Sequence, residues 1–437
     1  MTPQSAFMIC ASIRAGQLAN LRKLLAKMNN NKITGFADPH NKLIPFGSFE
    51  RLHFARFSIL EALTSEEIRA YGKTPEPWQP MLVFLGDVDG NRDSFLAELV
   101  THAEKGLHQI FSFCDGYPDV NSESLLAWLK AHHVKPAANY VNTLGRTVRQ
   151  VHEEAALHRI LTSHLQQIVE TVGRDNTREL RQRLLDHVEI EKFAGRLRLT
   201  PPASTPWCWR ICNLLNLIAV PLLLLLLLPF IVLFAPVFII WLFFTERSDP
   251  ELFIRPDPEH VKKLSAQEDW LVSNQFNVFG DIKPGLVRLW LFKFIMLLTD
   301  YAARHIYNHG FLTRIRTIHF ARWVFLDDNR RAFFASNYDG SHESYMDDFI
   351  NKVGWGLNLT FGGAVGYPRT RWLLFEGALR EQQFKYTQRR HQLGSEVWYK
   401  AYPDLTAVDL QHNSLIRQGV EVRQDSDEQI RAWLSLI

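Results

Sequence analysis

The stretch at residues 318–340, IHFARWVFLDDNRRAFFASNYDG, occurs in two versions in this 437-residue chain. The other version is split into LHFARFSIL at 52–60 and MLVFLGDVDG at 81–90. Both versions run from His-Phe-Ala-Arg through apolar segments to Asp-Gly. Self-similarity of this kind predicts two copies of one structural unit, and it outranks any local propensity.

The repeat continues beyond Asp-Gly. A displacement of 250 positions aligns 89–118 with 339–368, with nine identities in thirty positions and no gap, ending at Gly-Tyr-Pro in both copies. Upstream, FMICASIRAG at 7–16 resembles FNVFGDIKPG at 276–285. The duplication therefore covers at least two long blocks of about one hundred residues each.

Each copy has the same predicted order of elements. A strand ends at Ile-Arg/Lys-x-Gly, a helix follows, and His-Phe-Ala-Arg opens a second strand. After a third strand, Asp-Gly turns the chain into a second helix, and a final short strand is expected at 110–114 and 359–363. The order βαββαβ is that of a ferredoxin-like unit. We therefore expect an α+β protein with tandem ferredoxin-like repeats, whose sheets cover each other as a pseudo-dimeric α+β barrel.

One segment is extreme in composition. Residues 211–244 carry no charge, and a bilayer core needs roughly 20 apolar residues as a helix. Pro221, Pro229 and Pro236 interrupt the segment, which leaves a single kinked span or a helical hairpin. Because the two copies must lie on the same side of the bilayer to pair, the hairpin is the expectation.

Basic residues precede the apolar segment and predict a start on the cytoplasmic face of the inner membrane. Residues 286–303 read as an interfacial helix or as a core helix of the second copy. The expected organisation is a first repeat, a helical linker, a membrane hairpin, a second linker, a second repeat and a helical C-terminal extension, at 1–118, 119–206, 207–246, 247–274, 275–376 and 377–437. The piece at 395–417 faintly resembles 137–159, which favours a repeat that extends past Gly-Tyr-Pro.

Bulk composition excludes several classes of protein. A net charge of +3 shows no dense basic patch, so we expect no nucleic-acid partner. The four cysteines have no zinc-like spacing, and no metal-ligand or phosphate-binding motif is present. The expected partners are the lipid bilayer and a lipid or other amphiphilic ligand.

The repeated polar residues are the candidate site. At least one of Arg56 and Arg322 is expected to face the space between the sheets, and the two are either structural ion pairs or holders of an anionic ligand. The preceding histidines, His53 and His319, lie on the opposite face of a regular strand. They are structural residues or cofactor ligands. Asp89 and Asp339 precede helices, where an aspartate caps the helix or serves as a catalytic acid.

The architecture resembles the dimeric α+β barrel superfamily, which includes dye-decolorizing peroxidases and chlorite dismutases. Residues 86–90, GDVDG, are similar to the GxxDG motif of those peroxidases. The resemblance implies haem as a possible cofactor, with Asp89 as the catalytic acid, Arg56 or Arg322 as the distal arginine and His319 as the proximal ligand. The repeated His-Phe-Ala-Arg, Asp-Gly and Gly-Tyr-Pro set also resembles a bacterial family of uncharacterised membrane-anchored proteins.

Three functions remain open on the sequence. One is a haem peroxidase-like or lipid-oxidising enzyme, in which an arginine polarises bound peroxide. Another is a non-enzymatic binder of a lipid or other amphiphile at the membrane surface. Plain membrane scaffolding is the third.

Overall fold

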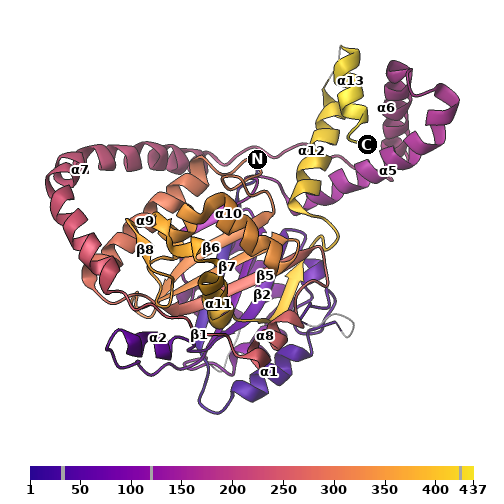
Figure 1. Cartoon of the computed structure of the whole chain (residues 1–437). Helices are drawn as coiled ribbons and strands as arrows, with labels where there is room; N and C mark the ends of the chain where they lie inside the picture. Colours follow the sequence, from indigo (N-terminus) through magenta and orange to yellow (C-terminus); the bar gives the residue numbers. More distant parts are fainter. Residues whose placement is uncertain (31–34, 119–121, 423–425) are drawn as a thin grey trace.

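The computed structural model describes residues 1–30, 35–118, 122–422 and 426–437. Its centre is formed by two four-stranded antiparallel sheets (Figure 1). The first sheet has the order β1 (Gln4–Ser12), β3 (Met81–Asp89), β2 (Leu52–Leu60), β10 (Ser395–Lys400). The second sheet has the order β4 (Ala138–Val141), β6 (Ile318–Leu326), β7 (Arg331–Asp339), β5 (Ser273–Asp281).

The fourth strand of each sheet comes from the other half of the chain. Strand β4 follows the first repeat but pairs with β6, and β10 follows the second repeat but pairs with β2. The residues shortly before β4 and β10 still pair with the half that they follow. His133, before β4, forms a β-bridge with Ile9, and Gln392, before β10, forms a β-bridge with Val278. These strands lie in the two stretches that resemble each other at 137–159 and 395–417. The linker and the C-terminal extension, which we expected to be helical, therefore each contain a strand.

The prediction of short strands at 110–114 and 359–363 is wrong. Helix α3 (Arg92–Phe111) and helix α10 (His342–Phe361) run through the start of these stretches. The buried residues near the end of α3, Leu107, Ile110 and Phe111, are spaced as on one helix face, so their apolar character reflects a period of 3.6.

The sheets and their helices form four layers. Helices α1 (Leu18–Ala26), α3 and α4 (Ser122–Ala131) bury the outer face of the first sheet. Helices α9 (Leu286–His305) and α10 cover the second sheet. Between the sheets lies a shared apolar core that includes Leu85 and Phe333.

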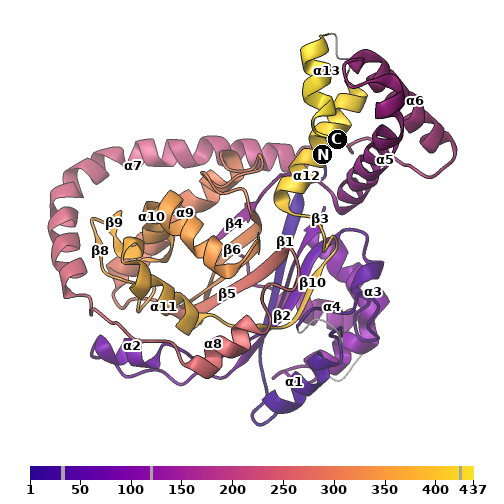
Figure 2. The same ribbon diagram turned by 45° about the vertical axis from the view of Figure 1, so that its right-hand side comes forward.

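The remaining elements lie around these layers. Short helices α2 (Ser65–Ala70), α8 (Pro258–Ser265) and α11 (Glu381–His391), two 3-10 turns (Phe46–Ser48 and Gly377–Leu379) and a ribbon of β8 (Thr370–Arg371) with β9 (Phe375–Glu376) complete the body. Helices α5 (Val148–Val172), α6 (Thr177–Phe193), α12 (Ala407–Glu421) and α13 (Asp427–Leu434) pack as a separate bundle that projects from it (Figures 1 and 2).

The apolar segment is one helix rather than the expected hairpin. Helix α7 (Trp207–Ser248) continues through Pro221, Pro229 and Pro236, and it is long and apolar enough to cross a membrane. At 100° per residue, steps of eight and seven residues place the three prolines within about 80° of one another. Kinks on one side of a helix add up to a bend in place of a reversal, and Figure 2 shows α7 as an arc around the second half.

Both ends of the arc contact α9. The imidazole Nε2 of His305 lies 2.8 Å from Oδ1 of Asn216, and Arg288 donates to the carbonyl oxygen of Thr245 at 3.0 Å. Between these contacts α7 rises about 44 Å along its axis and α9 only about 26 Å. Because the longer helix meets the shorter one at both ends, α7 must bow outward.

Candidate functional site

The two repeated arginines cross between the sheets in opposite directions. Arg56 on β2 donates to the carbonyl oxygen of Ser336 at 2.9 Å, to Asn277 Oδ1 at 2.8 Å and to Asn337 Oδ1. Arg322 on β6 donates to the carbonyl oxygen of Phe7 at 2.8 Å and to the carboxylate of Asp87. Both guanidinium groups are buried and hold the opposing sheet.

The two arginines differ in charge compensation. Arg322 has the carboxylate of Asp87, whereas Arg56 meets Asn337, which occupies the same position in the repeat. Burial, and then the charge of Arg322, lowers the pKa of Arg56 to about 9. Burial also raises the pKa of Asp87, against the opposing effect of the arginines. The interior between the sheets therefore holds two cations and one carboxylate, and the carboxylate of Asp87 contacts Arg322.

The histidines do not follow the alternation expected of a regular strand. Each lies at a β-bulge, one between Leu52 and Phe54 and the other between Ile318 and Phe320. A bulge inserts an extra residue and turns its side chain. The ring of His53 consequently lies 5.3 Å from that of Phe320, and His319 lies 5.3 Å from Phe54, so each histidine packs on the other half.

Each histidine is bonded to the aspartate of its own Asp-Gly pair. His53 Nε2 lies 2.9 Å from Asp89 Oδ1, and His319 Nε2 lies 2.7 Å from Asp339 Oδ1. The second carboxylate oxygens accept the backbone N–H of Val148 at 2.8 Å and of Ala407 at 2.6 Å.

The aspartates thus accept hydrogen bonds from the first residues of α5 and α12. These helices follow β4 and β10, the strands that each half exchanges with the other. The helices that directly follow Asp-Gly are capped instead by Asn91 and Ser341. A carboxylate near a helix N-terminus is favourable because it meets free N–H groups and the positive end of the helix dipole.

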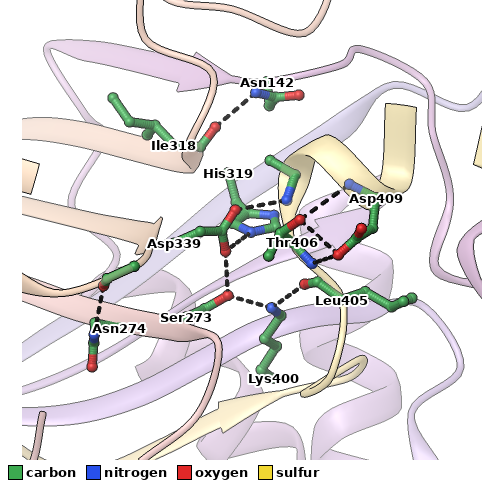
Figure 3. A network of polar contacts seen from close by, with 12 residues as sticks. Asn142, Ser273, Asn274, Ile318, His319, Asp339, Lys400, Leu405, Thr406 and Asp409 are labelled. Carbon is green, nitrogen blue, oxygen red and sulfur yellow. Dashed lines mark hydrogen bonds and ion pairs between the residues drawn. The ribbon is translucent and has the colours of Figure 1, made fainter. Parts of the chain in front are cut away.

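Only one of the two equivalent clusters carries a lysine. Lys400 donates to Ser273 Oγ and to the carbonyl oxygen of Leu405 at 2.6 Å, and Ser273 donates to Asp339 (Figure 3). Burial lowers the pKa of Lys400 to about 8, although Asp339 opposes this. Burial also lowers the pKa of His319. The equivalent strand position in the other cluster is Val141. Aligning the two exchanged strands in the sequence would have revealed this difference.

These residues do not fit a haem. Both ring nitrogens of His53 are hydrogen-bonded, to Tyr402 and Asp89 at 2.9 Å each, and Nε2 of His319 is hydrogen-bonded to Asp339. Both histidines are 2% exposed and pack against phenylalanines, so a porphyrin has no access to either ring. The arginines are bonded to the opposing sheet and meet no ligand space. The expected catalytic and cofactor-binding residues thus lie in the arginine contacts between the sheets and in the two histidine–aspartate clusters, and both kinds of contact join the halves.

The large apolar cavity lies elsewhere, between α9, α10 and the outer face of the second sheet. Its volume is about 470 Å³, within the range of ligand sites. Its lining includes Phe294 and Leu298 of α9, Phe349 of α10 and Trp323 of β6, and none of its described lining residues is Asp, Glu, His, Lys or Arg. The sequence pointed to an apolar cavity between the two copies, so the position of this one was not predicted.

The cavity continues toward the apolar helix. A smaller hollow of about 50 Å³ lies between α7, α9 and α10, and it shares Leu291, Ile295, Leu359 and Leu373 with the cavity. Trp241 and Leu242 of α7 form its other wall. The same hollow is also lined by Glu246, Asp249, Lys283 and Arg288, so the space between the cavity and the long apolar helix is partly charged.

The first half has side chains packed at the corresponding place. Phe57, at the repeat position of Trp323, is fully buried and stacks on Phe84 with ring centroids 4.3 Å apart. The contrast between HFARF and HFARW is one sequence signal that points to a difference here.

Comparison of the chain with protein-family models, with curated proteins and with solved structures gives no match. Within the described part of the chain, no group of three or more His, Cys, Asp or Glu side chains is placed to hold a metal ion. The functional argument therefore rests on the geometry of this molecule.

Proposed function

We propose that the protein is a membrane-anchored binder of a lipid or other amphiphile, which it holds in the cavity of its second half. The observation that carries this proposal is the uncharged 470 Å³ cavity, which shares lining residues with the hollow against α7. When a hydrocarbon chain displaces water from an apolar surface of this size, the free energy of the system falls, so binding is favoured.

The exposed apolar residues of the second half support the same proposal. Leu286, Val287 and Trp290 at the start of α9 and Phe375 and Leu379 beyond it are largely exposed, although contiguous exposed apolar surface is uncommon on soluble proteins. With α7 they form a surface suited to the bilayer. The contacts of both ends of the bowed α7 with α9 support a location of both halves on one side of the membrane, and we assign that side to the cytoplasmic face of the inner membrane.

The fold gives this proposal its structural frame. We interpret the two halves as ferredoxin-like units whose fourth strands are exchanged, with the buried arginine and histidine clusters as the joints between them. In this frame the first unit is a packed support and the second is the ligand-binding unit. The arginines serve the joint and hold no head group.

The test is to measure ligand binding in a variant with a filled cavity. Ala302 lines the cavity, whereas Leu297 lies on the same helix outside it. We expect Ala302→Phe to weaken binding of the neutral dye Nile red by at least about ten-fold and to deplete co-purifying lipid seen by mass spectrometry. Leu297→Phe, the matched control, should leave both unchanged. Equal dye binding and equal lipid content in Ala302→Phe and the wild-type protein would refute the proposal.

A further inference from the structure

We infer that the ligand is an uncharged amphiphile whose polar group both donates and accepts a hydrogen bond, as a hydroxyl or a primary amide does, and that this group binds the side-chain amide of Gln388. The inference rests on the proposed function and specifies the chemical class of its ligand. It depends on three features of the cavity, which are an amide without a partner, a lining without charge and a difference between the two repeats.

The amide without a partner belongs to Gln388 of α11. This residue lines the cavity together with Phe384 of the same helix and is only 4% exposed, and its amide makes no hydrogen bond to the described residues. The indole nitrogen of Trp323 also lacks a partner, but its neighbours enclose it, whereas the amide of Gln388 is not enclosed in this way and is open to the cavity. A buried polar group without a partner is costly, so a complementary group of a ligand is favoured beside it.

The chemistry of the amide and the charge of the lining decide the ligand class. A glutamine side chain offers N–H donors and a carbonyl acceptor, so its full complement is a group that also donates and accepts. Because no charged side chain lines the cavity in the described chain, an ionised head group would lose its hydration there without compensation. An uncharged hydroxyl or primary amide meets both conditions.

The position of Gln388 sets the direction of the hydrocarbon tail. Gln392, one turn further along the chain, forms a β-bridge with Val278 of β5, so Gln388 lies at the β5 edge of the second sheet. Strand β4 forms the opposite edge, three strand spacings or about 14 Å away, and the lining reaches it at Tyr140. A tail that begins at Gln388 therefore has the mostly apolar lining of the whole sheet face before it.

The other polar groups of the lining are engaged or lie elsewhere. The hydroxyls of Thr299 and Thr360 donate to backbone carbonyl oxygens one turn earlier in their helices, each at 2.8 Å. The hydroxyl of Tyr345 is bonded to another buried hydroxyl at 2.8 Å. The hydroxyl of Tyr307 has no partner among the described residues, but the residues that follow it pair with the segment after β4, at the edge opposite Gln388.

The repeat supports a ligand role for this glutamine. Gln388 and Leu129 are equivalent, because each lies four positions before a residue that forms a β-bridge with the first strand of its half, Gln392 or His133. Leu129 is fully buried in the packed core of the first half. The shared fold thus accepts an apolar side chain at this place, and the polar one occurs in the half that has the cavity.

The test compares two probes of similar size that differ at one end, since dodecyl alcohol has a hydroxyl where n-tridecane has a methyl group. Both compete with Nile red for the full-length protein in detergent, and each affinity is compared between protein variants, so that partition into the micelle cancels. We expect Gln388→Met, an apolar replacement of similar length, to weaken binding of the alcohol by about ten-fold and to leave that of the alkane unchanged. Gln382→Met, at an exposed position of the same helix, and Tyr307→Phe should each bind both probes as the wild-type protein does.

A second measurement observes the amide itself. In wild-type protein with ¹⁵N-labelled glutamine side chains, the N–H resonances of Gln388 are assigned by their loss in Gln388→Met. These resonances should move further downfield with dodecyl alcohol than with n-tridecane, because an N–H that donates a hydrogen bond is deshielded.

The outcomes separate the two proposals. An alcohol affinity that is unchanged in Gln388→Met, an equal loss of both probes in that variant, or an equal amide shift with both probes would overturn the hydrogen bond and leave the lipid-binding proposal standing. Failure of both probes to displace the dye, together with unaltered dye binding in Ala302→Phe, would overturn the proposed function itself.

Discussion

Arg56 and Arg322 cross between the sheets in opposite directions, but Arg322 meets the carboxylate of Asp87 and Arg56 meets the amide of Asn337. Substitutions can exchange these two partners. Asp87→Asn should destabilise the protein by about 3 kcal/mol, because it leaves the buried Arg322 without its carboxylate. Adding Asn337→Asp should recover most of this loss, because the new carboxylate lies against Arg56. Denaturant unfolding of the single and double variants in detergent measures both effects.

The Asn337→Asp single variant is the control for that exchange. It adds a negative charge where Arg56 lacks one, so it should raise the pKa of Arg56 and leave stability equal or higher. If Asp87→Asn changes the free energy of unfolding by less than about 0.5 kcal/mol, or if the double variant is no better than the single, the buried ion pair does not hold the sheets together.

Lys400 predicts a pH dependence of stability. In the unfolded chain its ammonium keeps its proton up to about its ordinary pKa of 10.5, whereas burial lets the folded protein release it near 8. Between these values the unfolded state binds more protons, so this residue makes stability rise with pH across the window. The free energy of unfolding of wild type minus that of Lys400→Met should therefore increase by up to about 3 kcal/mol between pH 8 and 10.5. A constant difference would show that the buried lysine does not titrate there.

At the level of single residues, the sequence identified the groups but not their roles. The sequence predicted that at least one of Arg56 and Arg322 faces inward, and in the structure both do. The orientation of His53 and His319 does not follow, because a bulge breaks the alternation and no local signal marks it. The hydrogen-bond partner of Asp89 could not be predicted either, because the backbone N–H of Val148 lies 59 positions further along the chain.

At the level of elements, long periodic helices and alternating strands were predictable, and the exchanged strands were not. Strand β4 has only four residues, and its Ala138 pairs with Trp323 of β6, 185 positions further along the chain. The resemblance between 137–159 and 395–417 showed that the two segments are equivalent, but resemblance carries no information about which half a strand joins. The bend of α7 was likewise hidden, because three prolines permit a hairpin or an arc. The contacts of Asn216 and Thr245 with α9 are what select the arc.

At the level of the whole molecule, strand exchange makes the halves depend on each other. A first half without β10 has an open edge at β2, and its own β4 has no partner, which exposes two sets of unpaired backbone groups. The second half lacks β4 beside β6 for the same reason. Neither half contains a complete sheet, although each contains a complete repeat by sequence.

This dependence predicts the behaviour of a divided chain. Residues 1–206 and 207–437, expressed together, should purify as a one-to-one complex, whereas either fragment alone should aggregate through its open strands. Val397→Pro removes a backbone donor within β10, so it should prevent the complex from forming. Val408→Ala, at an exposed position of α12, should leave the complex intact. A soluble monomeric 1–206 fragment with the β content of a complete sheet would contradict the exchange, because it would have to build its sheet without β10.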